Sequence, residues 1–215
     1  MNNFKFLPFP YLFSLSIEHS NRNLYTCESF NLRVLHDNTR ISSIFGQHEH
    51  GLAHKDVKAL RNIFTRSIYL PQDIIKHFPN LMHLYVPSSR VRFVSRKNFI
   101  GMTNVVTLDL RFNEIEFLPN DTFLDLFSLE ILSLGGNFIK KLQPNIFSNM
   151  LKMRFCDFSD NELVLFDDEI LSTNMELEEV LLNHNRLRAV NSNFEKFKDI
   201  GFIDLRGNVC IDTLF

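Results

Sequence analysis

Apolar residues recur along this chain with a period of 24 residues, beginning at Val57. Each unit reads apolar, x, x, apolar, x, apolar, x, x, polar, x, apolar, where x is any residue. Sequence repeats of this length predict a solenoid, because one unit cannot bury its apolar face without its neighbours. The units open at Val57, Leu81, Val105, Leu129, Met153, Leu177 and Ile200.

The fourth to sixth positions of each unit predict a short strand. Apolar residues alternate there with a period of two, as in Leu108 and Leu110, so one face of the strand is buried. At the ninth position the chain turns, and most units carry Asn. An amide side chain both donates and accepts, so it can bond the backbone groups of a buried turn. The column consists of Asn113, Asn137, Asn161, Asn185 and Asn208, with Ser89 and Thr65 in two other units.

This spacing resembles the leucine-rich repeat pattern LxxLxLxxNxL over residues 57–210. Units of 24 residues resemble those of secreted and receptor-type members of that family. The resemblance implies an α/β solenoid: a leucine-rich-repeat horseshoe with a concave parallel β-sheet and a convex side that is mostly irregular or short-helical. It also implies that the Asn side chains form a ladder between neighbouring turns.

A second recurring slot, in the latter half of each unit, predicts a stack of aromatic rings inside the convex side. Because these rings fill the core, they explain several of the 23 phenylalanines without any binding role. The slot holds Phe99, Phe123, Phe147 and Phe194, with Ile75 and Leu171 in two other units.

Three regions are predicted: a candidate signal peptide at 1–17, an N-terminal cap region at 18–56 and the repeat solenoid at 57–215. Residues 1–17 combine Lys5 with a short apolar run and small residues, which favours a secretory signal. Pro8 and Pro10 interrupt this run, and the alternatives are a stray or misplaced N-terminus or a packing segment. Short β-type runs within residues 24–56 indicate either a capping β-hairpin or a degenerate repeat.

Composition excludes several classes of protein. Hydrophobic residues make up 45% of the chain, which is typical of a globular protein rather than a disordered one. The net charge of −2 gives no basic excess for nucleic acid, and no apolar run is long enough to span a membrane. Cys156 fills a core position and is expected to be buried. Cys27 and Cys210 lie at opposite ends, too far apart to pair within one molecule but able to pair between molecules.

The sequence offers little for catalysis. It contains no nucleotide-binding or hydrolase motif, so we expect no enzymatic activity, no catalytic residues and no cofactor. His48, Glu49, His50 and His54 could in principle bind a metal, but their spacing fits no zinc motif. A solvated loop is the better interpretation, and no metal site is predicted.

What remains is the outward surface of the strands, where aromatic and Arg residues resemble the anchors of protein interfaces. The alternative is that these are ordinary strand residues, because aromatic side chains suit strands in any case. Gly135-Gly136 would let a partner approach the backbone closely. The predicted partner-binding residues are Tyr85, Asp109, Arg111, Phe112, Phe155 and Asp157, and Asn120 is the glycosylation candidate.

The sequence therefore predicts a secreted, extracellular, non-enzymatic module that binds a protein ligand or receptor on its concave face. One alternative is a cytoplasmic scaffold or regulatory subunit. Another is a structural protein that self-assembles, for example as a homodimer, through the edge strand near Ile203 and Leu205.

Overall fold

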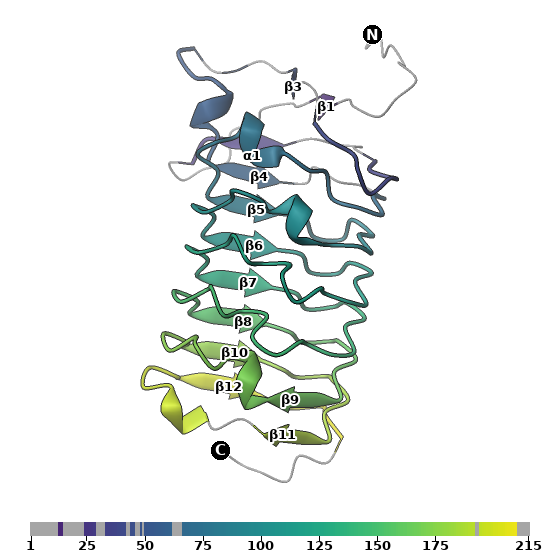
Figure 1. Ribbon diagram of the computed structural model, residues 1–215, viewed down its shortest axis with the longest axis vertical. Coiled ribbons are helices and arrows are strands. Elements are labelled where there is room, and N and C mark those ends of the chain that lie inside the picture. Colours follow the sequence, from purple (N-terminus) through teal and green to yellow (C-terminus); the bar gives the residue numbers. More distant parts are fainter. Residues whose placement is uncertain are drawn as a thin grey trace.

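The chain forms a solenoid of stacked turns with a parallel β-sheet along one side (Figure 1). The computed structural model describes residues 13–14, 24–28, 33–41, 44–45, 48, 50–61, 66–191 and 194–209. Eight strands lie side by side in the order β12-β10-β8-β7-β6-β5-β4-β2, and every pair is parallel. They are β2 (Thr26–Glu28), β4 (Ala59–Arg61), β5 (His83–Tyr85), β6 (Thr107–Asp109), β7 (Ile131–Ser133), β8 (Phe155–Asp157), β10 (Glu179–Leu181) and β12 (Phe202–Asp204).

The repeat strands of the sheet are three residues long, and the central residue of each packs in the core. Leu108, at the centre of β6, is fully buried and pairs with Leu84 and Leu132 in the neighbouring strands. The strand begins one residue earlier than the sequence pattern predicts. Leu110 lies beyond it but still donates its N–H to Ser133 O at 2.8 Å, after which the chain turns. The predicted horseshoe architecture is confirmed, and the outward side of this sheet is the concave face.

The sheet begins earlier than the first predicted repeat. Strand β2 lies within the predicted cap region and runs parallel to β4, with Cys27 opposite Leu60. Parallel pairing is the geometry of a repeat, whereas the strands of a hairpin run antiparallel. The chain that follows β2 also stacks on the chain that follows β4. Val34 O accepts a hydrogen bond from Ile68 N at 2.9 Å, and Val34 N donates one to Ser67 Oγ at 2.9 Å. These contacts favour the degenerate repeat over the hairpin.

Stacked aromatic rings fill the interior behind the sheet. The rings of Phe99, Phe123 and Phe147 follow one another with centroids 5.9 Å apart at each step, and all three are buried. The series then continues toward the sheet through Phe158, whose ring centroid lies 5.4 Å from that of Phe147. The slot continues with Leu171 and Phe194, both buried. These rings are committed to the core and are unavailable to a ligand.

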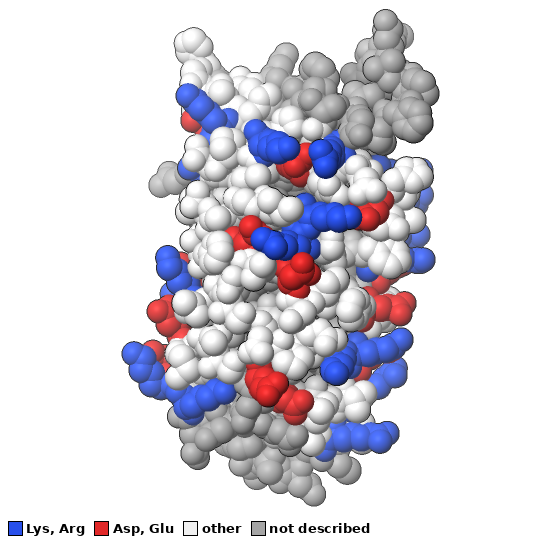
Figure 2. Space-filling view, viewed as in Figure 1, with Lys and Arg blue, Asp and Glu red and all other residues white. Residues whose placement is uncertain are grey.

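The convex side is built from irregular chain, single helical turns and short bridges. Strands β9 (Leu165–Asp167) and β11 (Ala189–Asn191) pair with each other at the edge toward which the main strands point (Figure 1). Charged side chains gather in the upper half and along both edges of the face drawn in Figure 2. The remaining elements are β1 (Phe13–Ser14), β3 (Ile44–Phe45), α1 (Ile74–His77) and the 3-10 turns η1 (His54–Asp56), η2 (Arg96–Asn98), η3 (Asp168–Ile170) and η4 (Phe194–Lys196).

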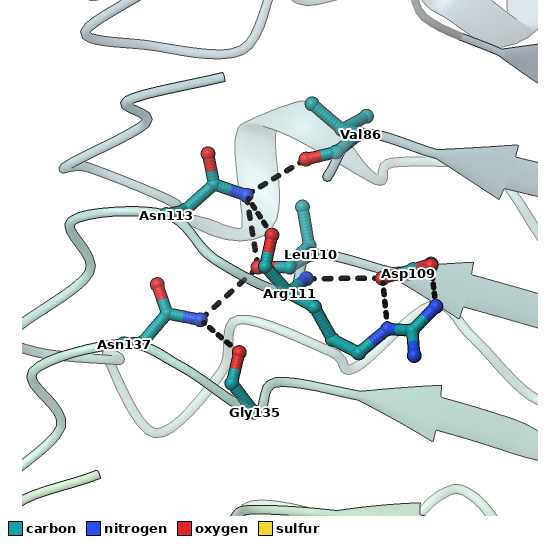
Figure 3. A network of polar contacts seen from close by, with 7 residues as sticks. All are labelled: Val86, Asp109, Leu110, Arg111, Asn113, Gly135 and Asn137. Atoms are coloured by element: carbon teal, nitrogen blue, oxygen red, sulfur yellow. Dashed lines mark hydrogen bonds and ion pairs between the residues drawn. The ribbon is translucent and has the colours of Figure 1, made fainter. Parts of the chain in front are cut away.

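The Asn column joins each turn to the one before it. Asn137 Nδ2 donates to Leu134 O of its own turn at 2.8 Å and to Leu110 O of the preceding turn at 3.0 Å. Its Oδ1 accepts the N–H of Ile115 at 3.1 Å. Asn113 makes the equivalent bonds one turn earlier, and Figure 3 shows the two amides side by side. Asn161, Asn185 and Asn208 repeat this arrangement.

Replacing Asn137 with Ala should lower the free energy of unfolding by about 1–3 kcal/mol, because the replacement leaves buried backbone groups without partners. The matched control is Asn120→Ala, which changes an exposed Asn on a convex turn and should be nearly neutral. Thermal and urea unfolding of both variants measure the difference. Equal stability of the two variants would contradict the role assigned to the ladder.

Candidate functional site: the concave face

The predicted partner-binding residues lie on neighbouring strands of the concave face. Tyr85 ends β5 and pairs with Asp109 at the end of β6, while Phe155 and Asp157 belong to β8. Arg111 follows β6 in the turn. Strand β7 separates β6 from β8, so the structure brings these residues to one region of the sheet but not into a single cluster.

Asp109 holds Arg111 rather than facing a partner. Asp109 Oδ1 accepts the Arg111 N–H at 3.0 Å and Nε–H at 3.1 Å, while Oδ2 accepts from Nη2 at 2.8 Å (Figure 3). The carboxylate raises the pKa of the Arg111 guanidinium through these hydrogen bonds. The Asp109 side chain is 7% exposed and that of Arg111 is 44% exposed. A partner would therefore contact a cation already fixed in place by the chain.

A similar arrangement recurs in the other two strands of the eight-stranded sheet that end in Asp, β8 and β12. Asp204 Oδ1 accepts from Arg206 N at 3.0 Å and Nε at 2.9 Å, and these bonds hold the Asp204 pKa below its usual range. Asp157 Oδ1 accepts from Ser159 N at 2.9 Å and Oγ at 2.6 Å. An aspartate at this position thus fixes the turn after its strand. Asp109 and Asp157 therefore have a mainly structural role, and the residues that they hold, Arg111 and Ser159, are the ones presented on the surface.

The Phe112 ring covers the space that Gly136, which has no side chain, leaves in the next turn. The Phe112 backbone adopts the left-handed conformation with φ of 56°, and 59% of the residue is exposed. A Cβ on Gly136, the equivalent residue of the next turn, would stand 2.4 Å from Phe112 Cδ1. A Cβ on Gly135 would stand 2.8 Å from Asp157 Oδ2. The expected bare approach to the backbone at Gly135-Gly136 is therefore wrong, because side chains of adjacent turns cover it.

A stack of three side chains occupies the N-terminal part of the concave face. The Arg61 guanidinium carbon lies 4.6 Å from the centroid of the Tyr85 ring, in cation–π geometry. The His83 ring is nearly parallel to that of Tyr85, with centroids 6.2 Å apart, and His83 Nδ1 is 3.1 Å from Thr107 Oγ1. Burial and the nearby Arg61 charge lower the pKa of His83. Tyr85 is thus part of a packed group rather than an isolated anchor.

Apolar side chains at the start of the strands form a second feature, which the prediction only partly includes. Ile131 of β7 pairs directly with Phe155 of β8, and Ile131 is 39% exposed. Phe202 of β12 is 48% exposed and is separated from Phe155 by Glu179 of β10. Ile131 and Phe202 share a repeat position with Phe155. Because of this shared position, the repeat alignment could have identified both residues from the sequence.

The two cysteines that the structure describes offer no reactive site. Cys156 is fully buried, and burial raises the pKa of its thiol far above the usual range. Cys27 is 1% exposed within β2, so pairing of Cys27 between intact molecules, which the sequence allowed, does not fit its burial. Cys210 lies outside the described residues.

The histidines near the N-terminal end pack against one another. His48 Nδ1 lies 2.7 Å from the Tyr25 hydroxyl, and the His48 and His54 rings meet edge to face with centroids 4.4 Å apart. His50 is exposed, and Glu49 is outside the described residues. Within the part of the chain that the structure describes, no group of three or more His, Cys, Asp or Glu side chains could hold a metal.

The structure describes only some of the residues that the sequence links to secretion. Asn120 is exposed on a convex turn. Of the candidate signal peptide, the structure describes Phe13–Ser14, which pair in parallel with Ile44–Phe45, and residues 1–12 and 15–17 fall outside it. None of the helices in the described ranges is both long and apolar enough to cross a membrane.

Comparisons with known proteins agree with the repeat architecture. Residues 79–139 match the family model described as leucine rich repeat. None of the curated proteins matches the chain in sequence. Among solved structures, the LRIM1/APL1C complex is similar with a TM-score of 0.73 and 20% identity, covering 93% of this chain and 36% of that one.

Two further structures have the same fold. The APL1 leucine-rich repeat domain gives a TM-score of 0.69 at 18% identity, covering 91% of this chain and 48% of that one. A Leptospira interrogans leucine-rich repeat protein gives 0.64 at 25% identity, covering 72% of this chain and 38% of that one. The chain thus spans less than half the length of each solved chain that it matches here.

The low pKa of His83 makes stability depend on pH. A histidine whose pKa is lower in the folded chain than in the unfolded one binds fewer protons when folded. Its stabilising contribution is complete above about pH 6.5 and is lost as the pH falls below that value. The melting temperature should therefore fall between about pH 7.5 and 5.5, and it should fall less in His83→Gln. An identical decrease in both proteins would mean that His83 does not contribute.

Proposed function

We propose, since the chain belongs to the leucine-rich repeat family, that it is a secreted, non-enzymatic module that binds a protein partner on its concave face. The observation that carries this proposal is the exposed Arg111 guanidinium, held in place by Asp109, beside the exposed ring of Phe112. Arg and aromatic side chains dominate the binding energy of protein interfaces, and fixing them in advance lowers the entropic cost of binding.

Further side chains extend this surface on both sides of Arg111. The Arg61–Tyr85 stack lies toward β4, and the apolar pair Ile131–Phe155 lies toward β8. Together they offer a partner a charged centre flanked by aromatic and apolar contacts. The similar LRIM1/APL1C structure is a complex, which supports a role in protein binding by analogy of fold.

Extracellular location is the second part of the proposal. It is supported by the apolar segment at residues 1–17 and by the exposed Asn120, which heads the sequon Asn120-Asp121-Thr122. Both features are expected of a secreted protein, and the burial of Cys27 and Cys156 is compatible with any compartment.

Secretion is tested by the intact mass of the tagged full-length chain recovered from cells and from their medium, with and without glycosidase. We expect the medium to contain a chain shortened by about 17–23 residues, with a glycosidase-sensitive mass on Asn120 that Asn120→Gln removes. An unshortened, unmodified chain of 25.3 kDa plus the mass of the tag, found in cells alone, would favour the cytoplasmic scaffold and leave the binding proposal standing.

The binding surface is tested with Arg111→Ser. Serine removes the guanidinium but can still donate to Asp109 Oδ1, because Ser159 donates from its N–H and its Oγ to Asp157 Oδ1 in another turn. Proteins captured by the wild-type chain are identified and their affinities for wild type and variant measured. We expect Arg111→Ser to weaken the relevant partner by at least about tenfold while the melting temperature is unchanged.

The matched control is Arg206→Ser, which makes the same change beside Asp204 at the far end of the sheet. This variant should retain wild-type affinity. Equal affinity of the Arg111→Ser, Phe112→Ala and wild-type chains for every partner would exclude this part of the concave face as the binding site.

A further inference from the structure

The edge at which the strands end forms a continuous strip along the solenoid. We call it the basic flank, and it comprises the tenth, twelfth and thirteenth positions of the repeats, residues 66 to 189. Backbone contacts align these positions: Glu114 N donates to Val91 O at 2.8 Å, and Tyr69, Phe93 and Phe117 form successive parallel bridges. Strands β9 and β11 continue the alignment at Leu165 and Ala189.

The basic flank has a charge opposite to that of the whole chain. It carries seven basic and three acidic residues, whereas the complete protein has a net charge of −2. Lys and Arg side chains follow the edge on the right of Figure 2, the edge toward which the strands of Figure 1 point. Its charged members are Arg66, Arg90, Arg92, Glu114, Glu116, Lys140, Lys141, Glu162, Arg186 and Arg188.

Every acidic residue of the flank forms an ion pair with a basic residue of the flank. Arg92 Nε lies 2.7 Å from Glu114 Oε2, and Arg186 Nη2 lies 2.9 Å from Glu162 Oε1. Lys140 Nζ lies 3.6 Å from Glu116 Oε2. Four cations then remain that form no ion pair within the described part of the chain. They are Arg66, Arg90, Lys141 and Arg188, spread over the length of the flank.

Exposed apolar side chains alternate with these cations. Phe93 and Phe117 are 56% and 57% exposed, and Phe138 is 48% exposed. Val164 and Leu165 continue the series, each 44% exposed. The ring of Tyr69 stacks on that of Phe93 with centroids 5.1 Å apart, so these rings cover one another's faces. Face-on stacking of a sugar or base on these two rings is therefore hindered, and their edges remain for apolar contact.

We propose that the basic flank is a second interaction surface, which takes an extended protein segment rich in acidic and apolar side chains. Acidic side chains would pair with the four unpaired cations, and apolar ones would cover Phe93, Phe117 and Phe138. The flank spans roughly 24 Å at about 4.8 Å per turn, which an extended segment of about eight residues covers. This surface is separate from the concave face and does not depend on the function proposed for it.

The ion-paired glutamates of the flank favour a protein segment over a continuous polyanion. Glu114, Glu116 and Glu162 neutralise Arg92, Lys140 and Arg186, so the unpaired cations are unevenly spaced and do not match the evenly spaced charges of a sulfated polysaccharide or a nucleic acid. A peptide can place its acidic residues opposite the cations alone. The exposed phenylalanines also offer nothing to a purely hydrophilic polyanion, whereas apolar side chains bury them.

The test measures binding of fluorescent synthetic peptides of about ten residues to the full-length chain by anisotropy. The probes are alternating Glu-Leu, Glu-Ser and Lys-Leu peptides, with heparin and phosphatidylserine vesicles as competitors. We expect Glu-Leu to bind most tightly and to weaken as salt is added. Lys141→Glu and Phe117→Ser should each weaken it by about tenfold.

Two variants on the opposite edge, where the strands begin, serve as matched controls. Lys152→Glu changes an exposed lysine that has no ion pair among the described residues, and Phe127→Ser changes a residue that is 49% exposed. Both should retain wild-type affinity. Equal losses in flank and control variants, absent Glu-Leu binding, or tighter binding of heparin, vesicles or Glu-Ser would each overturn the proposal. None of these outcomes would bear on the concave face.

Discussion

The structure depends on satisfying the backbone where each turn leaves the sheet. A parallel solenoid buries its turns between neighbouring repeats, and a buried N–H or C=O without a partner costs more than an ordinary hydrogen bond contributes. In five of the seven repeats one Asn solves this problem, because its amide bonds carbonyls of two turns and accepts an N–H from the preceding one. Regular spacing of the turns follows, and with it the alignment of every surface column described above.

The repeat fold is readable from the sequence because its determinants are local and periodic. Apolar spacing and the Asn column predict the sheet, and the recurring Phe slot predicts the stack through Phe99, Phe123 and Phe147. Strand β2 is harder to find, because Cys27 replaces the usual large apolar residue and its unit does not keep the 24-residue spacing. A degenerate turn pairs through its backbone, which leaves little trace in the side chains.

The surface is less predictable, because outward residues interact with neighbours that periodicity does not specify. The sequence places Asp109 and Asp157 on the concave face, but it does not reveal that each bonds the N–H two residues later. Nor does it show that Phe112 covers Gly136 from the preceding turn. The basic flank is hidden for another reason: its charges cancel in the overall composition and become visible only when the positions are aligned in space.

The buried cysteines have a consequence for how the stack moves. Cys27 lies in the first strand of the sheet and Cys156 in a central one, and neither can meet a reagent while its turn stays closed. In a solenoid each turn contacts only its neighbours, so the ends can open without the middle. Alkylation of Cys27 therefore reports fraying of the N-terminal end, and alkylation of Cys156 reports breathing of the interior. The two thiols therefore report these two motions separately.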